Sequence, residues 1–378
     1  MDMKARIILL ARHPIAAALA AAVIASATAN AGTLTTLYTF KGGVDGKYPS
    51  PLVYHGGKLY GTDYYGAEDN GNVFKVDAAT GAFKVVYAFK GGADGGIPET
   101  GLIYQDGTLF GTTIEGGTGG GTIFSVNAET NQEIAYPLSN FAGLIGLTYL
   151  AGTIYGLAES GGANGDGGIF TFNPTKGSLA PLYSFSGPDG KTPTGQLLYE
   201  NGLLYGTTTY GGQGVCHLGG CGTLFAINPQ TAAEVVVHSF GSKNGKYPYS
   251  NIAYHSGSFI ADTEVGGNQA CQRGCGVSYK VKAATGHEIV LDDFQSQGES
   301  YSGITVVGDN AYETLPAGGN GGYGALVEFS LKSGEQAVIY SFTGGADGSD
   351  PIAPLTYHNG AFYGSTWGVD GTIFKFVP

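Results

Sequence analysis

Charged side chains are scarce in this 378-residue sequence: Asp, Glu, Lys and Arg make up 13% of it, about half the share of an ordinary globular protein. Acids outnumber bases by 30 to 18, which gives a formal net charge of -12. The few bases form no cluster that could attract phosphate groups. This composition argues against nucleic acid and anionic lipid as partners. The polar surface must consist mostly of Gly, Asn, Ser, Thr and Tyr.

Long hydrophobic runs are also absent, apart from one near the N-terminus. Three basic residues precede an Ala-rich apolar run, Ile15 to Ile24, and Ala29-Asn30-Ala31 follows as a small-residue cleavage site. This order predicts a secretory signal peptide over residues 1–31 and a mature chain that starts at Gly32. An uncleaved anchor helix is the alternative, but the run is too short to span a bilayer comfortably. We expect an exported protein, secreted or periplasmic, without a membrane anchor after cleavage.

Apolar residues at helical spacing are missing from the mature sequence. Glycine is abundant instead, with 67 residues, and would indicate a flexible linker if it were evenly spread. The glycines are clustered between regularly spaced Tyr, Phe, Leu and Ile. They therefore mark the turns of an ordered β protein.

Internal repeats organise the chain. Strong copies read "GKLYGTDYYGAEDNGNVFKV", "GTLFGTTIEGGTGGGTIFSV" and "GLLYGTTTYGGQGVCHLGGCGTLFAI", and the chain ends on a fourth, "GAFYGSTWGVDGTIFKF". Three weaker copies complete the set. Each copy has an apolar, mostly aromatic residue at the same place, namely Tyr60, Phe110, Tyr155, Tyr205, Ile260, Tyr312 and Tyr363. The mature chain therefore contains seven units.

Each unit has the pattern of four short strands separated by turns. In the second unit "LIYQDG" is the first strand with its Asp-Gly turn, and "TLFGTT" and "GTIFSV" are the second and third. A turn such as "DAATG" leads to the fourth strand, as in "KVVYAF". Seven such units predict an all-β fold, a seven-bladed β-propeller of four-stranded antiparallel blades. A glycine recurs inside the second strand, which suggests closely approaching backbones at that place.

The two ends of the chain complement each other. The last unit has three strands and ends at "TIFKFVP", whereas the mature N-terminus begins with an extra fourth strand, "TLTTLYTF". If the N-terminal strand completes the last blade, residues 32–378 form a single closed domain. An open solenoid of the same units is the alternative, but it would leave an unpaired strand edge at each end.

Recurring motifs point to a family. The segments "FxGGxDGxxP" (Phe40 to Pro49, Phe89 to Pro98, Phe342 to Pro351), "LYGTT" and "GGGTIFSV" make the chain resemble the GloVer-type, choice-of-anchor tandem-repeat family of exported bacterial proteins. The resemblance spans nearly the whole mature chain and implies repeats but no particular reaction. A weaker similarity links "VFKVDAATGAFKVVY" to quinoprotein propeller repeats, but Trp367 lies outside their docking position, so no cofactor is predicted.

Loops displayed by a rigid scaffold are the usual place for function. In a propeller, the loops from strand two to three and from strand four to the next blade share one face, and here both are long and Gly-rich. We therefore expect ligand-binding residues on this face, where the repeats diverge: Tyr64, Tyr65, Glu115, Glu159, Tyr210, Glu264 and Trp367. Aromatic faces stack on sugars, and carboxylates accept hydrogen bonds from hydroxyl groups.

This residue set suits a glycan or protein ligand, and unconstrained loop surface is the alternative reading. Two or more carboxylates close together would instead allow acid–base catalysis, as in a polysaccharide lyase or hydrolase with its site in the central funnel. A structural module of an envelope assembly is a third possibility. No nucleophile–base–acid arrangement can be assigned, so the sequence favours a monomeric binding protein over an enzyme.

Two repeated polar residues have simpler explanations than metal binding. An aspartate recurs in the "GGxDG" loop as Asp45, Asp94, Asp189 and Asp347. Calcium needs six or more oxygen ligands, so one acid per loop is better explained as a turn residue. His55, His255 and His358 occupy equivalent turns of separate blades on the opposite face, and His238 lies in a strand as a packing residue. No metal is predicted.

The four cysteines interrupt the same Gly-rich loop in two adjacent units. Export and the even number favour disulfides. We predict local bridges, Cys216–Cys221 and Cys271–Cys275, that stiffen two loops of the candidate face. A zinc site made by all four cysteines is the alternative.

Overall fold

The computed structural model describes residues 32–378 except 139, 217–218, 242–244, 268–275 and 294–301. The predicted signal peptide lies outside the described residues. Within them no helix has the length and apolarity needed to cross a membrane. Helical structure in this part is limited to the short 3-10 turns η1 (Gly43–Asp45), η2 (Ala67–Asp69) and η3 (Gly92–Asp94).

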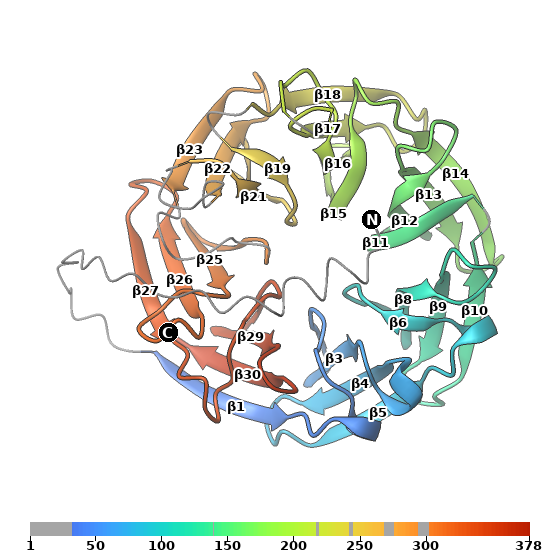
Figure 1. Cartoon of the computed structure of the whole chain (residues 1–378), viewed down its shortest axis with the longest axis vertical. Coiled ribbons are helices and arrows are strands. Elements are labelled where there is room, and N and C mark those ends of the chain that lie inside the picture. Colours follow the sequence, from blue (N-terminus) through green and yellow to red (C-terminus); the bar gives the residue numbers. More distant parts are fainter. Residues whose placement is uncertain (1–31, 139, 217–218, 242–244, 268–275, 294–301) are drawn as a thin grey trace. The chain divides into compact units, whose positions relative to one another are not determined.

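The strands form seven antiparallel sheets arranged as blades around a ring (Figure 1). The first three blades contain β2 (Val53–His55), β3 (Lys58–Asp63), β4 (Asn72–Asp77) and β5 (Phe83–Ala88); β6 (Gly96–Pro98), β7 (Ile103–Gln105), β8 (Thr108–Glu115), β9 (Thr122–Asn127) and β10 (Glu133–Pro137); and β11 (Phe141–Leu150), β12 (Thr153–Gly161), β13 (Gly168–Asn173) and β14 (Ser178–Ser184).

Blades 4 to 6 follow the same order along the chain. They contain β15 (Lys191–Glu200), β16 (Leu203–Tyr210), β17 (Thr223–Ile227) and β18 (Glu234–Ser239); β19 (Lys246–Pro248), β20 (Ala253–His255), β21 (Ser258–Val265), β22 (Val277–Lys282) and β23 (Glu288–Asp293); and β24 (Thr305–Val307), β25 (Asn310–Leu315), β26 (Ala325–Ser330) and β27 (Gln336–Ser341). The short β6 and β19 pair with the second strand of their blade, ahead of its first full strand.

Blade 7 combines both ends of the mature chain. It consists of β28 (Thr356–His358), β29 (Ala361–Thr366), β30 (Thr372–Val377) and, as its outer strand, β1 (Thr33–Thr39). The antiparallel register places Leu34 opposite Phe376 and Thr39 opposite Thr372. The predicted closure is therefore confirmed, and the prediction of a seven-bladed propeller is confirmed with it.

A glycine recurs in the second strand, where the sequence predicted closely approaching backbones. The structure shows a different cause. A Cβ at Gly111 would lie 2.4 Å from Cζ of Phe124 and 2.8 Å from Cδ2 of Leu102, so the glycine makes room for side chains of its own blade and not for another backbone. Equivalent glycines meet equivalent phenylalanines at Gly61, Gly156, Gly206 and Gly364. In blade 6, Glu313 takes the place of the glycine, and the smaller Val327 stands opposite it.

The blades are joined by a repeated X-Pro contact on the loop face. The residue before the proline has a positive φ, 60° for Tyr48 and 61° for Tyr247. Its N–H donates to a carbonyl of the preceding blade, as from Tyr48 to Asp370 O at 3.1 Å. The proline packs on a glycine, and a Cβ at Gly371 would lie 2.6 Å from Cδ of Pro49. The same contact recurs at Ile97-Pro98, Thr192-Pro193, Tyr247-Pro248 and Asp350-Pro351.

The recurring aspartate of the "GGxDG" loop orders its turn, as predicted. Asp347 accepts hydrogen bonds from the hydroxyl of Tyr340 at 2.9 Å and from the N–H of Thr343 at 2.8 Å. Tyrosine hydroxyls donate in the same way to Asp45, Asp94 and Asp189. These bonds tie each outer strand to the loop that leads to the next blade.

Candidate functional site

One register position collects variable side chains on the loop face of the ring; we call the inner edge of this face, around the ring axis, the channel mouth. In every blade it is the residue that comes directly after the last residue of the second strand to pair with the third. In blade 1 that last pair is Asp63 with Asn72, so the position is Tyr64. In blade 7 the last pair is Thr366 with Thr372, so the position is Trp367. The seven residues are Tyr64, Ile114, Glu159, Thr209, Glu264, Pro316 and Trp367. Four of the residues predicted from sequence occupy this position, and the other three, Tyr65, Glu115 and Tyr210, come one residue later.

Blades 1 and 7 bring aromatic rings together at this mouth. The ring centroid of Trp367 lies 5.0 Å from that of Tyr64 and 5.5 Å from that of Tyr48. Tyr65 lies 5.9 Å from Tyr48 and 6.2 Å from Tyr64. The indole N–H of Trp367 donates to the carbonyl of Pro49 at 2.9 Å, which fixes the ring against the X-Pro contact. We call Tyr48, Tyr64, Tyr65 and Trp367 the aromatic cluster.

A cation and an acid flank the aromatic cluster. Nζ of Lys47 lies 5.6 Å from the ring centroid of Tyr48 and 5.3 Å from that of Tyr65, within cation–π range. On the other side, the hydroxyl of Tyr64 hydrogen bonds to the carboxylate of Glu99 from blade 2. Burial raises the pKa of Glu99 and also that of Tyr64. The second carboxylate oxygen of Glu99 is buried without a hydrogen-bond partner.

A similar, smaller arrangement lies in blades 4 and 5. The ring centroids of Tyr210 and Tyr247 are 5.3 Å apart, and Nζ of Lys246 lies 5.6 Å from the ring centroid of Tyr247. Figure 1 shows β19, which carries Lys246 and Tyr247, across the central opening from β3, which leads to Tyr64. Tyr249, which follows Pro248, lies close enough to Tyr64 of blade 1 to raise its pKa electrostatically.

The predicted acids lie in three different blades. Glu115 ends β8 in blade 2, Glu159 lies in β12 of blade 3, and Glu264 lies in β21 of blade 5, each of them half-buried. The structure adds six residues that were not selected from the sequence: Lys47, Tyr48, Glu99, Lys246, Tyr247 and Tyr249. The repeated "GKYP" of residues 46–49 and 245–248 was the signal that could have identified most of them.

The Cys216–Cys221 disulfide is present, with 5.2 Å between the Cα atoms. Cys221 is fully buried with Phe240 between blades 4 and 5, and its carbonyl accepts the N–H of Tyr247 at 2.8 Å. The bridge therefore supports the X-Pro contact that carries Tyr247. It also rules out a zinc site made by four thiolates. Cys271 and Cys275 lie outside the described residues.

The histidines of the turn face connect neighbouring blades. His358 stacks on Tyr54 of blade 1 with 3.8 Å between ring centroids, and His55 stacks on Tyr104 of blade 2 at the same distance. Nε2 of His255 lies 3.2 Å from Asp309 of blade 6. His238 does more than pack, since its Nε2 lies 3.2 Å from a carboxylate oxygen of Glu288. Among the described residues, no group of three or more His, Cys, Asp or Glu is placed to hold a metal ion.

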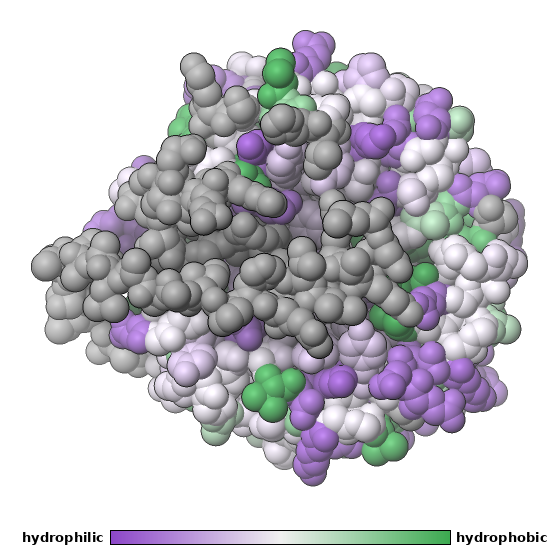
Figure 2. Space-filling model, viewed as in Figure 1, coloured by the Kyte–Doolittle hydropathy of each residue, from purple (hydrophilic) through white to green (hydrophobic). Residues whose placement is uncertain are grey.

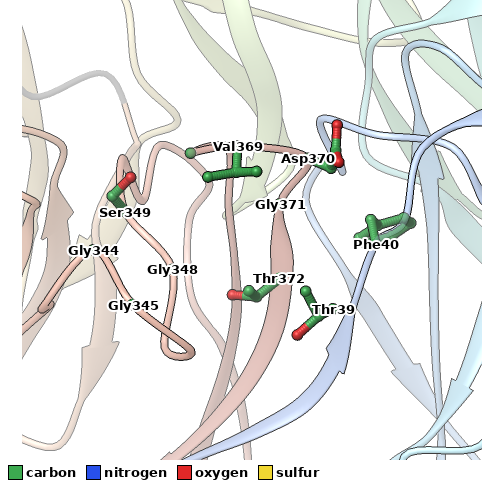
Figure 3. A pocket seen from close by; sticks show the side chains of 11 residues that line it. Thr39, Phe40, Gly344, Gly345, Gly348, Ser349, Val369, Asp370, Gly371 and Thr372 are labelled. Carbon is green, nitrogen blue, oxygen red and sulfur yellow. The ribbon is translucent and has the colours of Figure 1, made fainter.

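Two pockets lie on the described part of the chain, and the larger, about 460 Å³, is an open one on blade 2 lined by Thr108, Ser125, Asn127, Gln132, Glu133 and Ile134. A pocket of about 130 Å³ lies between loops of blade 7 and the end of β1, where Val369, Asp370, Ser349 and Thr372 surround it (Figure 3). It is too small to enclose an ordinary ligand. Figure 2 shows hydrophobic residues scattered among hydrophilic ones over the coloured part of the face in view. Within the aromatic cluster, Tyr64 is buried and Tyr48, Tyr65 and Trp367 are half-buried.

This chain is similar to one family of repeat proteins and to several solved structures. The family model of the Gloeobacter/Verrucomicrobia repeat matches residues 20–150 and 139–272. Among solved structures, the extracellular domain of BT4673 from B. thetaiotaomicron gives a TM-score of 0.62 at 11% identity, covering 90% of this chain and 39% of that one. An oligogalacturonate lyase in complex with manganese gives 0.55 at 10%, covering 91% and 92%. The computationally designed Ika8 protein gives 0.53 at 11%, covering 89% and 98%. No protein with a curated description matches. At these identities the structural likeness concerns the fold alone.

Proposed function

Because this chain belongs to the Gloeobacter/Verrucomicrobia repeat family, whose repeats here build a single rigid ring, we propose that it is an exported protein that binds a glycan at the loop-side mouth of its channel. The observation that carries the proposal is the aromatic cluster. It contains four rings from two blades, Tyr48, Tyr64, Tyr65 and Trp367. The ring centroids of the contacting pairs are at most 6.2 Å apart.

Sugar rings present C–H faces that stack on aromatic rings, and their hydroxyl groups need hydrogen-bond partners. Both requirements find candidates here. Trp367 and Tyr65 are half-buried and keep part of each ring accessible, and the half-buried carboxylates of Glu159 and Glu264 occupy the equivalent position in blades 3 and 5. The Trp367 ring is fixed before binding by its hydrogen bond to the carbonyl of Pro49, so little conformational entropy of this side chain is lost when a ligand binds.

Export rests on two independent features. The Cys216–Cys221 disulfide is typical of proteins that fold in an oxidising compartment. The N-terminal 31 residues have the order of a secretory signal. Detection of the mature chain starting at Gly32 in the periplasm or culture medium would support export, and retention of residues 1–31 on a cytoplasmic product would contradict it.

An enzyme of polysaccharide cleavage is the second candidate, and the Glu99–Tyr64 pair is the observation that favours it. A buried carboxyl group with a raised pKa, hydrogen bonded to a tyrosine in a channel, is suited to proton transfer. The propeller of the oligogalacturonate lyase shares the fold at 10% identity. Release of shortened or unsaturated products from a bound glycan, lost in Glu99→Gln, would establish this activity.

Binding is tested with the mature protein on a glycan array, followed by calorimetry. Trp367→Ala and Tyr65→Ala should each weaken binding about thirtyfold, as for aromatic anchors of a well-packed contact. Trp367→Phe keeps a ring but loses the hydrogen bond to Pro49, and should cost less. Tyr199→Ala is the matched control, since this tyrosine is 42% exposed in β15 next to the turn at Asn201. Equal affinity of wild type, Trp367→Ala and Tyr65→Ala for an array ligand would refute the site.

A further inference from the structure

Three loops that lead into blades carry the same four-residue pattern, Gly-Lys-x-Pro. They are residues 46–49 before blade 1, 190–193 before blade 4 and 245–248 before blade 5. In each the third residue has a positive φ: 60° for Tyr48, 53° for Thr192 and 61° for Tyr247. Since the backbone is the same, the three lysines occupy equivalent places on the channel rim.

These lysines differ in their partners. Nζ of Lys191 lies 2.7 Å from a carboxylate oxygen of Asp166, so this lysine is neutralised within the protein. Lys47 and Lys246 lie over tyrosine rings instead, and no carboxylate of the described residues is within ion-pair distance of either. Lys47 and Lys246 differ in this respect from Lys191, although all three have the same backbone setting.

Each of these two lysines forms a pair with an aromatic surface. The first Lys–Tyr pair is Lys47 with Tyr48, next to Tyr65 and Trp367. The second Lys–Tyr pair is Lys246 with Tyr247, next to Tyr210. Blades 1 and 5 place the two pairs on opposite sides of the channel mouth, with β19 across the opening from β3 (Figure 1).

We propose that the ligand is a carboxylated polysaccharide, a polymer of uronic acid units, whose chain extends across the mouth and engages both Lys–Tyr pairs. A sugar unit stacks on the tyrosine, and its carboxylate receives a charge-assisted hydrogen bond from the lysine beside it. Burial raises the pKa of the nearby acids Glu99 and Asp350, so they oppose such a ligand less than free carboxylates would. Glu159 in blade 3 and Glu264 in blade 5 also lie at the mouth, and the two lysines must outweigh their repulsion. The inference rests on the proposed glycan binding and specifies its substrate class.

Two linked contacts also give a dependence on chain length. Once one pair is engaged, the second contact forms within the same complex at a high effective concentration. A chain too short to reach both pairs loses this gain. Affinity should therefore rise steeply at the length that spans the mouth, and it should fall as salt concentration increases, since exposed charge pairs are screened.

The test uses calorimetry with the mature protein and two polymers of the same backbone, polygalacturonate and its methyl-esterified form. Wild type should bind the acid form at least about tenfold more tightly than the ester at low salt. Lys47→Met and Lys246→Met, which keep an apolar stem and remove the charge, should each weaken binding of the acid form about three- to fivefold. The double variant should lose the preference for acid over ester. Lys47→Arg should retain it, and Lys191→Met, the equivalent but ion-paired lysine, should behave as wild type.

Three outcomes would overturn the inference in distinguishable ways. Equal affinity for acid and ester, unchanged in the double variant but reduced in Trp367→Ala, would refute the carboxylated ligand and leave glycan binding standing. Binding of neither polymer would also refute it, and the glycan array would then decide the proposed function on its own. Retained preference in a folded double variant, verified by circular dichroism, would show that the lysines do not recognise the carboxylate.

Discussion

Removal of β1 tests how the ring is closed. The strand contributes Leu34, Leu37 and Tyr38 as partly buried side chains, and the fully packed Phe40 follows it, 3% exposed and 5.3 Å from Phe74 of blade 1. Full burial of such a side chain is worth about 1.5–3 kcal/mol. Counting Phe40 as buried and the others as half-buried gives about 4–7 kcal/mol, a large part of the stability of an ordinary domain.

Deletion of residues 33–40 from the mature chain should therefore lower Tm by about 10 °C or more, or cause aggregation through the exposed edge of β30. The matched control is a permutant that starts at Lys41 and carries residues 33–40 after Pro378 through a short turn. Because Thr33 pairs with Val377, the moved strand can continue from β30 as an ordinary hairpin. Calorimetry and size-exclusion chromatography should show the permutant near wild type. An unchanged Tm in the deletion, or a permutant no more stable than the deletion, would refute this account of closure.

Three further predictions concern packing, redox state and pH. Gly111→Ala should destabilise the protein by about 1–3 kcal/mol, because its Cβ would overlap the ring of Phe124, and a urea titration checks this with Gly241→Ala as the control, since Gly241 has open space for a Cβ and no positive φ. Reduction of Cys216–Cys221 should cost about 2 kcal/mol and lower Tm, and a Cys216→Ser variant that melts like wild type would contradict it. Burial, reinforced by the charge of Asp94 or Asp189, raises the pKa values of Glu133 and Glu234 to about 7. The folded state then holds these protons more tightly than the unfolded state, so their stabilisation is complete below about pH 4.5 and is lost as pH rises through 7. Tm should fall between pH 5 and 8 and should vary less in Glu133→Gln/Glu234→Gln, and an identical pH profile for both proteins would refute the assignment.

The ring architecture could be predicted because the sequence repeats the same pattern once per blade. Repetition of "LYGTT" and "GTIFSV" marks the second and third strands, and the extra N-terminal "TLTTLYTF" matches the strand missing from the end. The local sequence pattern was less informative about why a particular residue type is needed at a single position. Gly111 could be recognised as a position without room for a side chain, but only the structure identifies Phe124 as its neighbour.

The candidate site was only partly predictable. Variability at a repeated position identified Tyr64, Tyr65 and Trp367, which do meet. Tyr48 was missed because a residue before proline is expected in an extended conformation, whereas it has a φ of 60° stabilised by a hydrogen bond to another blade. Glu99 was missed because its contact with Tyr64 joins two blades, and the repeat pattern of one blade does not indicate contacts with the next.

The central claim, that a glycan binds at the aromatic cluster, can be tested through Trp367 itself. This residue is the single tryptophan of the chain, so its fluorescence emission reports on the site alone. Titration of the mature protein with polygalacturonate should change the emission saturably, with a midpoint that matches the calorimetric Kd and moves to higher concentration in Tyr65→Ala. A glycan that binds by calorimetry while the emission of Trp367 stays constant would place the ligand elsewhere and contradict the account.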